Sequence, residues 1–176
     1  MRSAHTAWRT FLFPIFAAVL VFSSTRSWAQ QVVPQIFSQR IVGTWMLVSA
    51  HDTQKDGSDI NRWGATPKGS LMFDANGRYM LIISRSDISK FAGKSVNDGS
   101  PEENKAVVQG LIASFGSYTV SEPNKIMTHV EGSSFPNLNG IDQIRIIRTL
   151  TADELVYDNP TSSTGAASHV VWKRIK

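Results

Sequence analysis

The stretch SLMFDANGRYMLIIS, residues 70–84, carries the clearest structural signal in the sequence. Two runs rich in apolar residues, 70–73 and 78–84, flank a connection that ends in Asn76 and Gly77. Asn-Gly readily adopts the positive backbone dihedrals that a tight turn between antiparallel strands requires. The sequence therefore predicts a β-hairpin at this position.

Further strand signals fill the chain on both sides of this hairpin. Each is a run of apolar and β-branched residues bounded by Gly, Pro, Asn or Asp, which is typical of short antiparallel strands. These runs cover residues 40–53, 115–121, 126–134, 141–150, 154–158 and 168–175. With the hairpin they make about eight strands, and closing such a sheet into a barrel removes its exposed edges. We therefore expect an all-β antiparallel barrel whose interior is filled by side chains or holds one small ligand.

One segment predicts a helix instead. Ser100 supplies a capping hydroxyl, Pro101 suits the first helical position, and Glu103 adds an acidic side chain in the first turn. We expect a short helix from there to about Ala113, with one apolar face that can lie on the sheet. The preceding residues, 85–99, are mixed in character and predict a long loop, which with the helix could form a lid.

The first 29 residues resemble a secretory signal peptide. Met1 to Arg9 is basic without acidic residues, Phe11 to Phe22 is almost wholly apolar, and Ser27-Trp28-Ala29 provides small residues before a cut at Gln30. The twelve-residue apolar run is shorter than the roughly 20 residues that span a bilayer. We expect no membrane anchor after cleavage, a periplasmic or secreted protein, an N-terminal extension over 30–39 and a single domain over 40–176.

Composition excludes several classes of function. Without cysteine there is no disulfide, thiolate metal site or cysteine nucleophile. The net charge of +4 includes Arg2, Arg9 and Arg26 of the leader, so the remaining chain carries 15 − 14 = +1 and gives no indication of nucleic-acid binding. The three histidines after the leader lie far apart, and Gly93-Lys94-Ser95 lacks the first glycine of a phosphate-binding loop. We expect neither a metal nor a cofactor.

A wider set of short motifs resembles the bacterial lipocalin-like domain family from Arg40 to Arg174. It begins with the Gly-x-Trp signature at Gly43-Thr44-Trp45 and continues through GSLMF at 69–73, NGRYM at 76–80, SR at 84–85, FA at 91–92, PEE at 101–103, GSY at 116–118, HVEGSSFPN at 129–137, then Gly140, Gln143, Arg145 and VWKR at 171–174. The resemblance implies a lipocalin-type barrel with a cavity. It also implies that Gly43, Trp45 and Arg174 are structural residues, with Arg174 packing over the Trp45 ring at the narrow end.

Polar residues that carry the resemblance also form the main candidate site. If the connection between the strands 126–134 and 141–150 is centred near Asn137, Glu131 lies opposite Gln143 and His129 opposite Arg145. All four side chains would then share one face, with Glu131 and Arg145 close enough to pair. Two interpretations remain open. Either this face is the solvated outer wall, or it points inward as the polar floor of a ligand pocket.

These patterns favour a binding protein over an enzyme. We expect a small apolar or amphipathic molecule inside the barrel, oriented by His129, Glu131, Gln143 and Arg145. Arg85 and Phe91 of the long loop are additional contact candidates. An alternative is a cofactor-free isomerase, cyclase or hydratase in which His129 or Glu131 is the base and Arg145 stabilises negative charge. A second alternative is a filled barrel that acts only as a scaffold.

Overall fold

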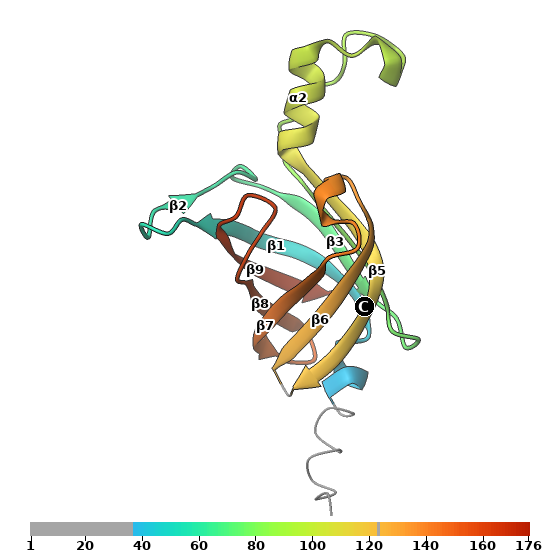
Figure 1. Cartoon of the computed structure of the whole chain (residues 1–176), viewed down its shortest axis with the longest axis vertical. Helices are drawn as coiled ribbons and strands as arrows, with labels where there is room; N and C mark the ends of the chain where they lie inside the picture. Colours follow the sequence, from blue (N-terminus) through green and yellow to red (C-terminus); the bar gives the residue numbers. More distant parts are fainter. Residues whose placement is uncertain (1–36, 123) are drawn as a thin grey trace, which may run out of the picture.

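Eight antiparallel strands close into a barrel in the computed structural model, which describes residues 37–122 and 124–176 (Figure 1). The last strand pairs with the first, so the ring has no free edge among these eight strands. Around the ring the strands are β1 (Gly43–Thr53), β3 (Lys68–Phe73), β4 (Arg78–Ser84), β5 (Leu111–Glu122), β6 (Lys125–Ser133), β7 (Asp142–Leu150), β8 (Glu154–Asn159) and β9 (Ala167–Arg174). A two-residue strand, β2 (Asp59–Ile60), pairs with the end of β1. The predicted all-β barrel is confirmed.

The leader lies outside the described residues, as does most of the expected extension over 30–39. No helix among residues 37–122 and 124–176 has the length and apolar character of a membrane span.

The hairpin between β3 and β4 forms as the sequence predicts. Phe73 pairs with Tyr79, and Gly77 has a φ of 80°, a value that glycine adopts without strain. One carboxylate oxygen of Asp74 accepts hydrogen bonds from the backbone N–H groups of Asn76 and Arg78, at 2.8 and 2.7 Å. This local bonding fixes the turn and hence the register of the two strands.

The helix α2 (Pro101–Gly110) begins at its predicted cap. The Ser100 hydroxyl accepts from the backbone N–H of Glu103, whose carboxylate accepts from the backbone N–H of Ser100. The helix ends three residues before Ala113 because residues 111–113 pair with β4 as the start of β5. It projects from one end of the barrel instead of lying on the sheet (Figure 1). The predicted loop before it contains a short 3-10 helix, η1 (Val96–Asp98).

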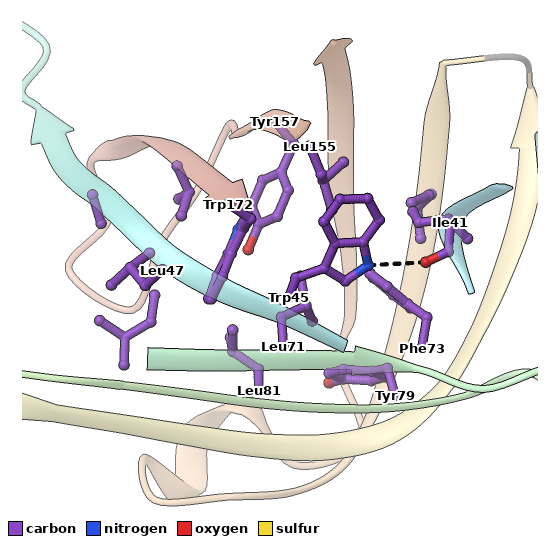
Figure 2. Packing of buried hydrophobic residues seen from close by; sticks show 14 of the residues in the cluster. Ile41, Trp45, Leu47, Leu71, Phe73, Tyr79, Leu81, Leu155, Tyr157 and Trp172 are labelled. Atoms are coloured by element: carbon purple, nitrogen blue, oxygen red, sulfur yellow. Dashed lines mark hydrogen bonds between the residues drawn. The ribbon is translucent and has the colours of Figure 1, made fainter. Parts of the chain in front are cut away.

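The opposite end of the barrel, here called the Trp45 end, is filled by aromatic side chains. Trp45 and Trp172 are fully buried there with Leu155, and the Trp45 indole donates a hydrogen bond of 3.0 Å to the carbonyl of Ile41 (Figure 2). The Arg174 guanidinium carbon lies 3.9 Å from the centre of the Trp45 ring, so the predicted contact is present. Gly43 is necessary beside it, because a Cβ at that position would collide with the Arg174 guanidinium.

Candidate functional site

The α2 end of the barrel contains a polar cavity. Four of the five buried polar residues in the described chain line it, each contributed by a different strand: Asp52, Ser114, Arg145 and Asn159. Because successive residues of a strand point to opposite faces, these four occupy inward positions in an otherwise apolar interior. The cavity, here called the inner chamber, has a volume of about 50 Å³. Such a space holds a few water molecules or one small polar group.

Arg145 is the least compensated charge in the inner chamber. It is only 5% exposed, and it donates hydrogen bonds to Gln143 Oε1 at 2.9 Å and to the Ile144 carbonyl at 3.3 Å. Its guanidinium carbon lies 5.7 Å from the centre of the Tyr157 ring. No carboxylate of the described residues is within ion-pair distance, and the undescribed residues contain no Asp or Glu. The guanidinium can therefore accommodate an anionic partner from outside the chain.

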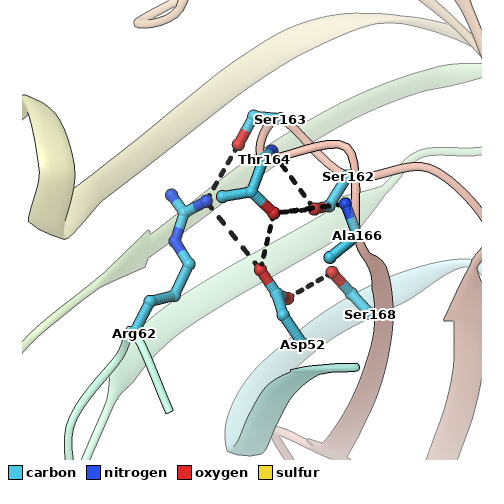
Figure 3. Close-up of polar contacts among 7 residues, drawn as sticks. All are labelled: Asp52, Arg62, Ser162, Ser163, Thr164, Ala166 and Ser168. Carbon is cyan, nitrogen blue, oxygen red and sulfur yellow. Dashed lines mark hydrogen bonds and ion pairs between the residues drawn. The ribbon is translucent and has the colours of Figure 1, made fainter. Parts of the chain in front are cut away.

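Asp52 supplies the negative charge of the inner chamber. Its side chain is 1% exposed and accepts hydrogen bonds from Ser168 Oγ at 2.5 Å and Thr164 Oγ1 at 3.1 Å (Figure 3). The nearest cation is Arg62, whose Nη1 lies 4.0 Å from Asp52 Oδ2. The carboxylate is thus held by Thr164 of the β8–β9 loop and Ser168 of β9, and it is balanced by one arginine.

Arg62 separates the inner chamber from a second hollow. Its Nη1 donates to Ser163 Oγ at 3.1 Å, its guanidinium carbon lies 4.0 Å from the centre of the Trp63 ring, and its Nε is buried with no partner in the described chain. Burial lowers the pKa of the guanidinium, and the nearby Asp52 partly opposes that effect. Arg62 and Ser163 line both spaces.

The second hollow, here called the vestibule, has a volume of about 390 Å³ and lies between the base of α2 and the loops at that end of the barrel. Its wall is more apolar than that of the inner chamber and includes Val108, Leu111, Ile112 and Phe135. The two spaces together form a narrow polar compartment behind a wider apolar one. This is the arrangement expected for an amphipathic ligand.

Tyr157 adds a neutral polar group to the inner chamber. Burial raises the pKa of its phenol, and the charge of Arg145 only partly opposes this rise. The side chain therefore remains an uncharged donor at neutral pH. Its ring stacks on the buried Trp172 indole, with the ring centres 6.4 Å apart.

The predicted register between β6 and β7 is wrong. His129 pairs with Asp142 and Thr128 with Gln143, a shift of three residues from the predicted pairing. Residues 125–129 of β6 pair with β7 on one side, whereas residues 130–133 pair only with β5, which borders the whole of β6 on the other side. The connection to β7 contains the 3-10 helix η2 (Pro136–Leu138). Because the shift is odd, it places the two halves of the predicted polar face on opposite sides of the sheet.

The structure consequently divides the predicted site. Gln143 and Arg145 point into the barrel, whereas His129 and Glu131 lie on the outer wall. Glu131 forms a two-bond ion pair with Arg78 and not with Arg145 as predicted, and a hydrogen bond from Arg78 lowers the pKa of its carboxyl group. His129 Nδ1 is 2.7 Å from an Asp142 oxygen. The predicted acid–base pair is therefore not at the cavity.

Of the two loop residues predicted to contact a ligand, one lies at a cavity and the other does not. Arg85 lines the vestibule, where its guanidinium forms two hydrogen bonds to Asp87, at 2.8 and 2.7 Å. Phe91 packs beside Gly99 in the segment before α2 and lines neither the vestibule nor the inner chamber.

Sequence reasoning missed three residues of the site: Asp52, Arg62 and Tyr157. Asp52 carries a usable signal, since an acidic residue at an inward position of a strand must find partners in the interior. Arg62 lies in an irregular loop, where no periodicity indicates its direction. As for metals, the described residues contain no group of three or more His, Asp or Glu side chains arranged to hold an ion.

One comparison with known proteins identifies a family. The profile of a family described as "Lipocalin-like domain" matches residues 42–175. Two similar solved structures are a redesigned β-barrel, with 15% identity, a TM-score of 0.42 and coverage of 79% of this chain and 95% of that one, and the redesigned barrel mFAP1 bound to DFHBI, with 16% identity, a TM-score of 0.38 and coverage of 78% and 97%. No curated protein matches the chain.

Proposed function

The chain belongs to the lipocalin-like domain family over residues 42–175, and on that basis we propose that it binds a small amphipathic molecule through the α2 end of the barrel. The polar end of the molecule occupies the inner chamber, and its apolar part occupies the vestibule. One observation carries the proposal: Arg145 is buried at a cavity without a carboxylate partner in the chain. A buried charge without a partner is costly, so a ligand that supplies one gains affinity.

The volumes of the inner chamber and the vestibule indicate which part of the ligand each space can bind. The inner chamber, at about 50 Å³, admits a small polar group and no more. The apolar part must then bury its surface in the vestibule, where each Å² removed from water contributes about 25 cal/mol. Binding is proposed to depend on both compartments together.

We also propose that residues 1–29 direct the protein to the periplasm or the medium and are then removed. The support is the sequence alone: a basic start, an apolar run and small residues before Gln30. N-terminal sequencing of the protein recovered from the periplasmic fraction tests this, with Gln30 expected as the first residue.

The proposed binding is tested by what co-purifies with the protein from its own host. Native mass spectrometry should show a mass above that of the chain, and denaturing extraction should release a small molecule. In a Ser114→Leu variant, extra carbon fills the inner chamber, and the ligand should be lost. Ser117→Leu is the matched control, because Ser117 lies on the same strand with its side chain on the outer wall.

Two outcomes would overturn the proposal. If the parent protein repeatedly carries no added mass and gains no thermal stability from small amphiphiles, the barrel is a filled scaffold. If a molecule is bound but Ser114→Leu retains it while remaining folded, the ligand lies elsewhere on the protein. A bound molecule that the protein converts to another would instead favour the isomerase, cyclase or hydratase alternative, with catalytic groups other than His129 and Glu131.

A further inference from the structure

The charges around the inner chamber do not balance. Two guanidinium groups, Arg62 and Arg145, line it with the single carboxylate of Asp52. Counted formally, this gives a charge of +1 in a space that is largely shielded from water. One negative charge on a ligand would neutralise it, whereas a cation would add to the repulsion.

The surplus charge belongs to Arg145 and not to Arg62. Asp52 lies 4.0 Å from Arg62 Nη1, whereas no carboxylate of the described chain is that close to Arg145. A guanidinium carries five N–H donors in a planar fork that fits a carboxylate with two parallel hydrogen bonds. Arg145 donates to Gln143 and Ile144 and lies within reach of the Tyr157 phenol, which leaves part of its five-donor fork available to a ligand.

The neighbours of Arg145 also favour an acceptor over a donor. Gln143 Oε1 accepts from Arg145, which leaves the amide nitrogen of Gln143 as a donor. Tyr157, the other polar neighbour, keeps its phenolic proton at neutral pH because burial raises its pKa. The chamber thus presents N–H and O–H groups around a positive charge, which is suited to carboxylate oxygens.

From this arrangement we infer that the ligand is a monoanionic carboxylic acid, bound head first with its carboxylate on Arg145 and its uncharged apolar body in the vestibule. This inference rests on the proposed function and specifies its chemistry. The chamber volume of about 50 Å³ matches a carboxylate group. Val108 and Phe135 provide apolar contacts for a short chain or a ring outside it.

The test compares three probes of matched shape and different charge: hexanoate, hexanamide and hexylamine. Binding to the ligand-stripped full-length protein is measured by isothermal titration calorimetry and by the shift in melting temperature. Hexanoate should bind about tenfold or more tightly than hexanamide, because charge-assisted hydrogen bonds are about twice as strong as neutral ones. Hexylamine should not bind measurably.

Variants then assign the effect to a residue. Arg145→Met keeps the stem and removes the charge, so hexanoate should bind no more tightly than hexanamide, while Arg145→Lys should give an intermediate preference because it lacks the planar fork. Arg148→Met is the matched control, since Arg148 lies on the same strand, is exposed and pairs with Asp158 on the outer wall. It should retain the full preference for hexanoate.

The possible failures are distinguishable. Equal binding of hexanoate and hexanamide by the parent overturns the carboxylate inference and leaves the proposed binding function intact. A preference for hexanoate that persists in folded Arg145→Met also overturns it, because a group other than Arg145 would then bind the carboxylate. If Arg145→Met does not fold, the comparison of probes on the parent and on Arg145→Lys decides. Absence of binding by all three probes, together with an empty protein from the host, overturns both proposals.

Discussion

Trp45 and Arg174 are direct cross-strand partners, and the guanidinium carbon of the arginine lies over the indole at 3.9 Å from the ring centre. The same guanidinium donates to the carbonyls of Val42 at 2.7 Å and Ala152 at 2.6 Å, and to that of Arg40. One side chain therefore joins the segment before β1 to the turn before β8. It closes the Trp45 end of the barrel with a hydrogen-bonded cap over a buried ring.

Replacement of Arg174 by leucine should therefore destabilise the fold. The loss combines the cation–π contact with hydrogen bonds to three carbonyls, about 2 to 4 kcal/mol in the free energy of unfolding. Arg174→Lys keeps the charge without the fork and should recover part of the loss. Urea denaturation measures both, with Lys176→Leu as a control because Lys176 is exposed. A loss for Arg174→Leu no larger than that control would mean that the cap contributes nothing.

The fold was predictable because its determinants are local in the sequence. The Asn76-Gly77 turn, the Ser100 cap and the alternating strands each need only a short window to be recognised. The resemblance also predicted the contact between Arg174 and the Trp45 ring, which the structure contains. The error in the helix end also has a local cause, since the Leu111–Glu122 strand begins without any breaker after Gly110.

The site was less predictable because it depends on register. A symmetric hairpin centred near Asn137 is the simplest expectation for β6 and β7. In the structure the connecting residues form η2, and residues 130–133 of β6 have no partner in β7. Because of the odd shift, Gln143 and Arg145 point into the barrel while His129 and Glu131 lie on the outer wall. Alternation identifies which residues share a face, whereas the face that is buried depends on the pairing of both strands.

The outer-wall placement of His129 and Glu131 predicts that neither residue affects ligand binding. His129→Ala and Glu131→Gln should bind hexanoate as the parent does, because both side chains are exposed and interact with Asp142 and Arg78 instead of the cavity. Calorimetry on both variants provides the measurement, and Arg145→Met is the positive control. Loss of binding in either folded variant would place the true site on the outer wall.

The ionised Asp158 side chain should stabilise the fold, and this part of the free energy of unfolding should be lost at acid pH. Burial opposes ionisation of its carboxyl group, but hydrogen bonds from His169 and Arg148 outweigh that cost and hold the pKa below its ordinary value. With the folded pKa below the unfolded one, the stabilisation is complete above the unfolded value and is lost as pH falls through the folded value. Asp158→Asn should flatten the decline in unfolding free energy below about pH 4.

The effect is measured as the slope of the free energy of unfolding against pH. The absolute free energy is not used, since Asp158→Asn also weakens contacts to His169 and Arg148. Unfolding free energies are compared at several pH values from neutrality down to below about pH 4, which covers the range where the loss is expected. The control is Asp59→Asn, which replaces an exposed carboxylate of β2 that accepts a hydrogen bond from Thr53 Oγ1. An unchanged slope in Asp158→Asn would show that the ion pairs of Asp158 do not persist in solution.

Arg62 should control how fast a ligand reaches the inner chamber. Its side chain lines both spaces and is held by Ser163 at 3.1 Å and by the Trp63 ring, so its removal joins the vestibule to the chamber. Arg62→Ala alone would leave the buried Asp52 carboxylate without its cation, at a cost of about 3 to 5 kcal/mol. The double variant Asp52→Asn/Arg62→Ala avoids this cost and keeps the formal chamber charge at +1.

Stopped-flow tryptophan fluorescence should show faster association and dissociation of hexanoate in the double variant, with a dissociation constant that changes little because Arg145 is intact. Asp52→Asn alone serves as the control, and rates equal to those of this control would show that ligands reach Arg145 by another route.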